Sequence, residues 1–334
     1  MSKRALQARR LEGTDENIWV KFVTLTAAHK AVNLGQGFPN FPPPDFVKDA
    51  FVEAVGRKDT LMHQYTRAFV CSSNLKGHPR LVAVLARLFG KLLGRELDPE
   101  TNVLVTVGAY QSLFCCFQAL VDEGDEVIII EPYFDCYEPM VKMAGGTPVF
   151  IPLRLVSGQT VFSRKELELI ANLCVKHDVL CFSDEVYEWL VYDGNEHIRI
   201  VSIHLKGFLS FYHLNFQEAV ACGLEKELER FGKPDSYFVQ LPQQLQRKRD
   251  FLIQNLMAAG MKPIVPEGTY FLMVDLSPFK VELPDQANSE EPYDSRFVEW
   301  MIKNKGLAAI PVSAFYSSQQ KKNFDHFIRF CFAK

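Results

Sequence analysis

Short runs rich in β-branched residues alternate with longer, periodically apolar stretches between residues 101 and 190. The short runs have the length of strands, and the longer stretches repeat apolar residues every three or four positions, as helices with one buried face do. The predicted strands are residues 103–107, 126–130, 147–153 and 179–183, and the predicted helices are residues 110–120, 137–143 and 163–177. This alternation predicts an α/β fold with a mainly parallel sheet covered by helices.

The helix at 163–177 has a defined start. Ser163 is followed three residues later by Glu166, and a serine oxygen and a glutamate carboxylate at this spacing satisfy each other's free backbone amides. This capping box predicts that the helix begins directly after Ser163.

The pattern changes beyond residue 205. Helices and strands follow in mixed order there, with helices predicted at 236–259 and 294–305 and strands at 270–274 and 327–332. A smaller α+β portion is therefore expected at the C-terminal end. Residues 202–216 fit neither period, and the polar stretch 282–292 predicts an exposed loop.

Composition and charge narrow the choice of partner. The chain has 334 residues, of which 48% are apolar and 23% charged, the composition of a globular protein with a sizeable core. Its formal charge of -3 and pI near 6.3 give no electrostatic reason to expect nucleic acid or an anionic membrane as partner. A small molecule or a protein is expected instead.

Two features bear on the compartment. The eight cysteines form no Cys-x-x-Cys pair and several lie in apolar runs, which predicts buried free thiols and a reducing environment. No metal site is predicted. No apolar run is long enough to span a bilayer, so the cytosol is expected. Four basic residues that precede the first acid weakly resemble a mitochondrial presequence, with a solvated basic end as the competing explanation: Lys3, Arg4, Arg9 and Arg10.

Residues at the ends of the first two predicted strands could contact a cofactor. Gly108 lies where the strand at 103–107 meets a helix, and a glycine there lets a phosphate approach free backbone amides. Packing between strand and helix is the competing explanation. Phe134 follows the next strand and could cover a flat cofactor, or it could belong to the core.

Three further residues carry candidate chemistry. Asp184 and Tyr187 follow the strand at 179–183, where a carboxylate could pair with a protonated ring nitrogen and a phenol could donate to a ring oxygen. An acid at this position is also typical of a helix cap. Arg329 lies inside an apolar strand, where its guanidinium could bind a substrate carboxylate through two parallel hydrogen bonds or form a structural salt bridge.

Seven motifs follow one another along the chain. They are Asn33-Leu34-Gly35-Gln36-Gly37-Phe38-Pro39, His63-Gln64-Tyr65-Thr66-Arg67, Gly108-Ala109-Tyr110, residues 131–139, Ser183-Asp184-Glu185-Val186-Tyr187, Gly268-Thr269-Tyr270-Phe271 and Ile328-Arg329-Phe330. In this order they resemble the class I pyridoxal phosphate (PLP) dependent aminotransferases, and within that class the kynurenine aminotransferase or cysteine-S-conjugate β-lyase group. The resemblance covers nearly the whole chain.

The resemblance implies a PLP site. Ala109 and Tyr110 match the backbone donors to the PLP phosphate, and Phe134 matches the ring that stacks on the pyridine. Asp184 and Tyr187 match the partners of the pyridine nitrogen and of the 3-oxygen.

The resemblance also implies a substrate site and a homodimer. Gly37 and Arg329 match the site of the substrate carboxylate, and Trp19 matches an aromatic wall of the substrate pocket. Tyr65 matches a residue that reaches the phosphate bound by the neighbouring subunit. Amino acids and 2-oxo acids are the implied substrates.

The implied architecture is the PLP-dependent transferase fold type I. Its expected domains are an N-terminal arm with part of the small domain at 1–45, a large PLP-binding domain at 46–235 and a C-terminal small domain at 236–334. The family's large domain contains a seven-stranded sheet, which is expected to be incomplete here.

Two segments depart from the family pattern. Between Phe150 and Phe162 the family has an Asn-x-Pro-x-Gly loop whose asparagine contacts PLP, and no such asparagine is present. Between Ser202 and Gln217 the family has a Ser-x-x-Lys segment with the Schiff-base lysine and then further strands of the sheet. Here that stretch contains only Lys206, without the Ser-x-x-Lys context. Missing central strands leave unpaired backbone and apolar faces inside a sheet.

Two interpretations of the function stay open. The resemblance implies a kynurenine–2-oxoglutarate aminotransferase, with β-elimination from cysteine conjugates as a side activity. Because the lysine exchanges with the substrate amine and moves the Cα proton, its absence favours a catalytically inactive deletion or splice product, in which covalent attachment of PLP is not expected and no catalytic residue is assigned. No Gly-x-Gly-x-x-Gly follows a predicted strand, which sets aside a nucleotide-dependent oxidoreductase.

Overall fold

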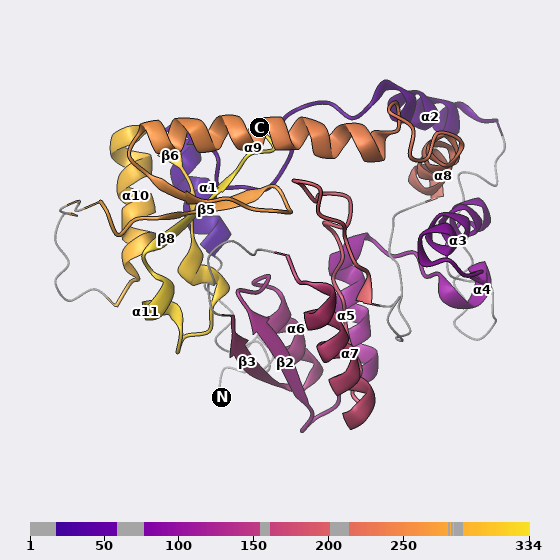
Figure 1. The fold of residues 1–334 in the computed structure, drawn as a ribbon, viewed down its shortest axis with the longest axis horizontal. Helices are drawn as coiled ribbons and strands as arrows, with labels where there is room; N and C mark the ends of the chain where they lie inside the picture. The colour runs from indigo at the N-terminus through magenta and orange to yellow at the C-terminus, as the bar shows by residue number, and fades with distance from the viewer. Residues whose placement is uncertain are drawn as a thin grey trace, which may run out of the picture. The chain divides into compact units, whose positions relative to one another are not determined.

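The computed structural model describes residues 18–58, 77–153, 161–200, 214–279, 281, 283 and 290–334. The chain divides into two compact units, each assembled from segments far apart in the sequence (Figure 1). Unit 1 comprises Met1–Asn40, Cys116–Thr160 and Gln244–Lys334, and unit 2 comprises Phe41–Cys115 and Val161–Gln243. The domain limits expected from the family stay predictions.

A four-stranded sheet is the centre of unit 1. Its strand order is β4 (Lys262–Ile264), β5 (Phe271–Asp275), β8 (Phe327–Cys331) and β7 (Ile310–Pro311), and all neighbours are antiparallel. Leu272 and Val274 of β5 and Ile328 and Phe330 of β8 are buried. These two strands confirm the strands predicted near the C-terminal end.

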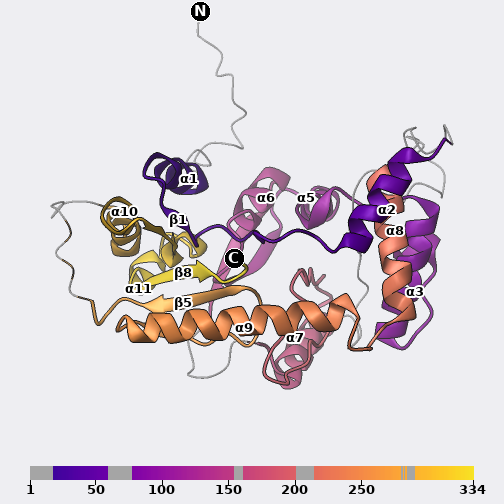
Figure 2. The ribbon, with the colours of Figure 1, turned by 90° about the horizontal axis from the view of Figure 1, so that it is seen from above.

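Helices cover this sheet (Figure 2). Helix α9 (Tyr237–Ala258) lies along β5 in both views, and α10 (Tyr293–Lys305) packs on β7 and β8. Both helices were predicted, within one residue at each end. Helix α1 (Ile18–Ala28) packs on α10 in turn.

Short elements complete this part of unit 1. Strand β1 (Val32–Asn33) pairs in parallel with β6 (Leu307–Ala308), which joins the N-terminal segment to the C-terminal one. The 3-10 helix η4 (Val312–Phe315) follows β7, and α11 (Lys321–Phe324) precedes β8.

A second sheet of unit 1 is parallel and covered on one face. Strands β2 (Glu126–Glu131) and β3 (Thr147–Pro152) pair in parallel, with α6 (Tyr137–Ala144) as the crossover. Successive side chains of a strand point to opposite faces, and Ile129 is buried. On the opposite face Ile128 is 61% and Ile151 47% exposed. Parallel sheets are ordinarily covered on both faces, whereas the second face of this sheet is exposed in the part of the chain that the structure describes.

Unit 2 has a helical core. Helices α2 (Asp45–Gly56), α3 (Pro79–Leu93) and α8 (Leu214–Glu229) lie side by side in both views. Helix α3 contributes several fully buried side chains, and Ala221 of α8 packs against them. The short helix α4 (Pro99–Asn102) follows α3. Burial of leucine side chains between these helices supplies the main stabilisation of the unit.

An ion-pair network joins the same helices. Arg80 of α3 donates to both carboxylate oxygens of Glu225 at 3.1 and 2.6 Å and also to Glu218, which is buried. Arg57 lies 2.7 Å from the same Glu218 carboxylate. A buried carboxylate is stable only when its charge is compensated, and two guanidinium groups provide this compensation.

Helix α7 (Arg164–His177) confirms the capping box. The Ser163 hydroxyl accepts a hydrogen bond from the Glu166 amide at 3.4 Å, and the Glu166 carboxylate accepts one from the Ser163 amide at 2.7 Å. The predicted helix limits are confirmed because both signals that set them are local.

Two of the predicted strands are wrong. Residues 103–107 and 179–183 belong to no helix or strand among the residues that the structure describes. Val103 packs into the core beside α3 instead of a sheet, whereas Val179 and Leu180 are exposed. A β-branched run becomes a strand only when a neighbour completes its hydrogen bonds, and no such neighbour is present within the described ranges.

The core of unit 2 makes a stability prediction. Leu88 of α3 is 2% exposed and Leu169 of α7 is 60% exposed. Replacing Leu88 by alanine leaves a cavity and is expected to lower the free energy of unfolding by about 2–5 kcal/mol, measured by chemical denaturation. The same replacement at Leu169 is expected to change it by less than about 0.5 kcal/mol. Equal losses at the two positions would contradict this assignment of the core.

Candidate cofactor and substrate site

Arg329 lies in an aromatic cluster of unit 1. Its guanidinium carbon is 3.8 Å from the ring centre of Phe271, 4.3 Å from that of Phe315 and 5.7 Å from that of Trp19. Rings attract a cation over their faces. The N–H donors of a guanidinium lie in its own plane, which is the geometry that grips a carboxylate with two parallel bonds.

Trp19 is held in place by a hydrogen bond. Its indole N–H donates to Asp135 Oδ2 at 2.7 Å, and Asp135 directly follows Phe134 in the sequence. Trp19 comes from α1 and Asp135 from the turn between β2 and α6. This bond therefore ties the predicted wall of the substrate pocket to the segment that carries the predicted cofactor ring.

Gly37 approaches the same aromatic rings closely. A Cβ atom at this position would lie 2.3 Å from Cζ of Phe271 and 2.9 Å from the Tyr270 ring, which is closer than any side chain tolerates. The Tyr270 hydroxyl donates to the Gly37 carbonyl at 3.2 Å. The structure thus brings Gly37, Arg329 and Trp19 together around Phe271 and Phe315.

Hydrogen bonds between the end of β2 and the region of η4 support this cluster. The Tyr133 amide donates to the Phe315 carbonyl at 3.0 Å, and the Ser317 amide donates to the carboxylate of Glu131, which is fully buried. The Tyr133 hydroxyl donates to Glu138 at 2.7 Å. Burial and this bond raise the pKa of Tyr133, so the phenol stays protonated.

Sequence patterns missed four residues of this arrangement. Phe315 lies in none of the seven motifs, and the motifs that contain Glu131, Asp135 and Phe271 assign no role to these three residues. Glu131 did carry a signal, because an acid at the end of an apolar strand is rarely buried without a partner.

Phe134 lies in the segment between β2 and α6. It is exposed, and it contacts the Tyr137 ring edge-to-face with 5.8 Å between the ring centres. An exposed aromatic ring that is fixed by a neighbouring ring suits the stacking role that the resemblance implies.

The predicted phosphate contacts lie in unit 2. Helix α5 (Gly108–Leu120) begins at Gly108, whose φ is 79°, a backbone conformation that favours glycine. The Gln111 side chain accepts a hydrogen bond from the Val107 amide at 2.6 Å. Ala109 and Tyr110 follow in the first turn, where amides have no intrahelical acceptor and the helix dipole is positive.

Asp184 and Tyr187 lie in a turn of unit 2. The Asp184 carboxylate accepts a hydrogen bond from the Val186 amide at 3.3 Å and so stabilises a turn, whereas no helix begins here for it to cap. Asp184 is exposed and Tyr187 half-buried. Tyr65 and Lys206 lie outside the described residues.

The chain matches a known protein family over most of its length. Residues 29–156 and 203–334 match the model of the family described as aminotransferase class I and II. The chain belongs to this family. PLP is the family's cofactor, and the fold is the PLP-dependent transferase fold type I. Asp184 and Tyr187 fall in the stretch that this match leaves out.

Curated relatives match the chain from end to end. Kynurenine–oxoglutarate transaminase 1 from Homo sapiens is 48% identical, with 99% of this chain and 95% of the relative covered. Kynurenine–oxoglutarate transaminase 3 from Homo sapiens is 41% identical, with 100% of this chain and 88% of the relative covered. The first alignment spans 409 residues against 334 in the chain, so at least 75 of its positions face a gap in this chain.

Solved structures share the fold. Bna3p from Saccharomyces cerevisiae is 25% identical, with a TM-score of 0.85 over 99% of this chain and 95% of that chain. N-Succinyldiaminopimelate aminotransferase from Mycobacterium tuberculosis is 26% identical, with a TM-score of 0.83 over 98% and 96%. Among the described residues, none of the helices is both long and apolar enough to cross a membrane.

The close approach at Gly37 makes a second prediction. Replacing Gly37 by alanine forces Phe271 and Tyr270 to move and is expected to change the near-ultraviolet circular dichroism and to lower the free energy of unfolding by about 1–3 kcal/mol. Gly56, at the end of α2, has open space within 4 Å of where a Cβ atom would lie and serves as the matched control. An unchanged aromatic spectrum in the Gly37→Ala variant would show that the cluster does not depend on this contact.

Proposed function

We propose that this chain is a non-catalytic relative of the kynurenine–2-oxoglutarate aminotransferases. It recognises the carboxylate of an amino acid or a 2-oxo acid and contacts PLP, but it does not fix PLP on a lysine. This proposal rests on the family to which the chain belongs and on the lack of the family's Ser-x-x-Lys segment in its sequence.

The observation that carries the proposal is the absence of a suitable amine. From Tyr187 to the start of α8 at Leu214 the sequence contains one lysine, Lys206, without a Ser-x-x-Lys context. A lysine amine has to reach the aldehyde carbon of PLP, exchange with the substrate amine and then move the Cα proton. The alignment gaps support the idea that the segment with this amine was deleted.

The residues present fit PLP only in part. Taken by itself, unit 2 offers the N-terminus of α5 for the phosphate and the exposed Asp184 carboxylate for the ring nitrogen, and unit 1 offers the exposed Phe134 ring for the pyridine face. PLP would supply an electron-withdrawing ring that makes the Cα–H bond of a bound amino acid acidic. Because the Schiff-base lysine and the family's asparagine loop are both lacking, the set fits recognition and not covalent binding.

The described sheet supports the same conclusion. Only β2 and β3 form the parallel sheet within the described ranges, and one of its faces is exposed. Residues 179–183, which lead to Asp184, are not held in a ladder. Catalysis by positioned groups requires supports that are fixed to within about half an ångström, and among the described residues no strand ladder provides such a support for this turn.

Recognition of a carboxylate rests on unit 1 alone. Arg329 is stacked on Phe271 and Phe315, while Trp19 and Gly37 border the same cluster. A stacked guanidinium has lost part of its conformational freedom before binding, which lowers the entropic cost of gripping a carboxylate. We infer that the chain still binds a substrate carboxylate although it does not catalyse transamination.

The second candidate is an active aminotransferase. The 48% identity to kynurenine–oxoglutarate transaminase 1 favours it, and it would use Lys206 as the amine, with kynurenine and 2-oxoglutarate as substrates and β-elimination from cysteine conjugates as a side activity. Under both candidates we propose a homodimer, in which Tyr65 reaches the neighbouring subunit's phosphate site, and a cytoplasmic location.

Borohydride reduction separates the two candidates. We expect that the purified chain, incubated with PLP, freed of excess PLP and reduced, carries no stoichiometric PLP adduct on any single lysine in peptide mass mapping. Human kynurenine–oxoglutarate transaminase 1, treated in parallel, serves as the positive control. A one-to-one adduct at Lys206, together with transamination of kynurenine, would establish the active alternative instead.

The carboxylate site makes a separate prediction. Replacing Arg329 by leucine removes charge-assisted hydrogen bonds and is expected to weaken binding of 2-oxoglutarate or L-kynurenine roughly 10- to 100-fold, measured by calorimetry. Arg247 of α9 is exposed, and the same replacement there is expected to leave the affinity unchanged. Equal affinities of the two variants would remove Arg329 from the proposed site.

A further inference from the structure

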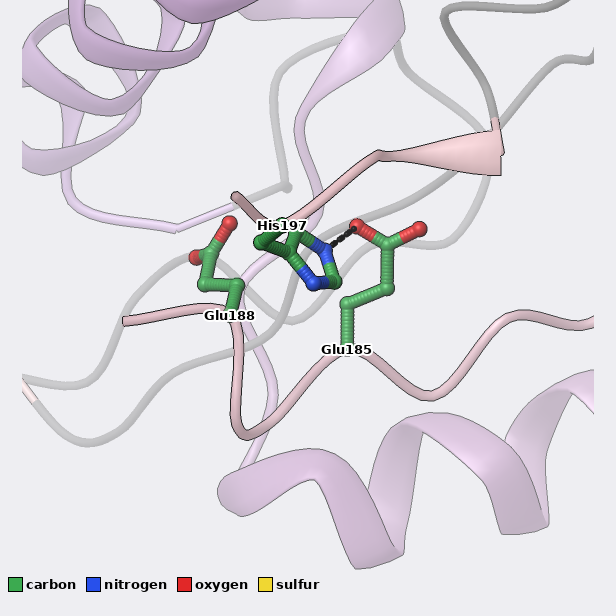
Figure 3. A group of neighbouring side chains, drawn as sticks. All are labelled: Glu185, Glu188 and His197. Atoms are coloured by element: carbon green, nitrogen blue, oxygen red, sulfur yellow. Dashed lines mark hydrogen bonds and ion pairs between the residues drawn. The ribbon is translucent and has the colours of Figure 1, made fainter. Parts of the chain in front are cut away.

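Three side chains of types that bind metal ions lie close together in unit 2. Glu185, Glu188 and His197 each offer one donor atom, and these atoms lie within 4.8 Å of one another (Figure 3). Their side chains are only 19%, 11% and 22% exposed. Cysteine spacing gave no metal site in the sequence, but this cluster uses carboxylates and an imidazole.

The Glu185 carboxylate is oriented from outside the cluster. Its Oε1 atom accepts hydrogen bonds from the Ser183 hydroxyl at 2.9 Å and from the Ile200 amide at 3.2 Å. Its Oε2 atom lies 3.0 Å from His197 Nε2. Donors that hold one carboxylate oxygen and direct the other toward a common point are the usual outer shell of a metal ligand.

The Glu188 carboxylate is oriented in the same way. Its Oε2 atom accepts hydrogen bonds from Nε and Nη2 of Arg199 at 2.8 and 2.6 Å. Burial raises the pKa of Glu188 although Arg199 lies beside it, and the nearby charge of Glu185 adds to this rise. The Arg199 guanidinium thus holds Glu188 through one oxygen, while Glu185 is held by Ser183, Ile200 and His197.

We propose that Glu185, Glu188 and His197 bind a divalent cation of the Zn²⁺ type, with water as a further ligand. Imidazole and carboxylate are ligands that Zn²⁺ accepts, and three protein ligands with one open position are a common zinc arrangement. Ligands at the usual Zn²⁺ distances lie roughly 3.4 Å apart, so donor atoms up to 4.8 Å apart have to approach by up to about 1.4 Å. Rotation of the carboxylates about their side-chain bonds allows this.

The cation has a structural consequence for the candidate site. Glu185 and Glu188 alternate along the turn with Asp184 and Tyr187, while His197 comes from the following stretch. A bound cation would fix this turn, which no ladder holds among the described residues. Since binding needs neither PLP nor a lysine, the inference stands apart from the proposed function.

Cobalt titration tests the site. The full-length chain, with its thiols reduced and metals removed by chelation, is titrated with Co²⁺ as a spectroscopic substitute for Zn²⁺, and with Zn²⁺ in a calorimeter. We expect one Co²⁺ per chain, with visible bands of nitrogen and oxygen ligation and no sulfur-to-cobalt charge-transfer band. Glu188→Gln and His197→Ala are each expected to weaken binding about tenfold or more.

A matched control variant and a stability measurement show whether a loss of binding is specific to the cluster. His177 is exposed at the end of α7, and His177→Ala is expected to bind Zn²⁺ as the unmodified chain does. Added Zn²⁺ is expected to raise the melting temperature of these two proteins more than that of the cluster variants. Glu188→Gln keeps the side-chain shape and carries the test if His197→Ala does not fold. Equal affinity in all four proteins, or a thiolate band, overturns the proposal.

Discussion

A guanidinium stacked between aromatic rings organises the candidate site in unit 1. Arg329 projects from β8, Phe271 belongs to the neighbouring strand β5 and Phe315 to η4, so one side chain joins three elements. An apolar strand accommodates an arginine only where the faces of the guanidinium are covered and its N–H donors can reach an acceptor or solvent. The parallel pairing of β1 with β6 brings the segments of Trp19 and Gly37 to the same rings. The candidate carboxylate site is therefore a product of packing between both ends of the chain.

The parallel sheet lacks this kind of mutual support. Strands β2 and β3 bury one face against α6 and expose isoleucines on the other. Residues 103–107 and 179–183 have the composition of strands, yet they form none in the described structure. Local sequence specifies that a segment can be extended and apolar, but a neighbouring strand has to supply the hydrogen bonds. Helix α7 needed no such neighbour, because its cap of Ser163 with Glu166 acts within four residues, and its limits could be predicted.

The residues of the candidate site, like the elements of the fold, could be predicted only in part. The family resemblance pointed to Trp19, Gly37 and Arg329, and the structure places all three around one cluster. The partners of Asp135 and Glu131 could not be found from the sequence, because they lie 116 and 186 residues away along the chain. Their contacts exist only after the segments have packed. Motifs record which side chains touch a ligand, whereas the bonds that hold those side chains are spread over the whole fold.

The cluster around Arg329 and the position of the family's Schiff-base lysine belong to different parts of the sequence. The carboxylate cluster uses the segments before residue 40, around β2, and from β5 to β8, and none of these includes the altered stretches at 151–161 and 203–216. The amine that would react with PLP belongs, in the family, to the second of those stretches. A deletion there removes the group that forms the bond without touching the contacts around Arg329. Because binding energy and bond formation are separable contributions, a chain of this kind is expected to keep its affinity for a substrate carboxylate after it has lost its turnover.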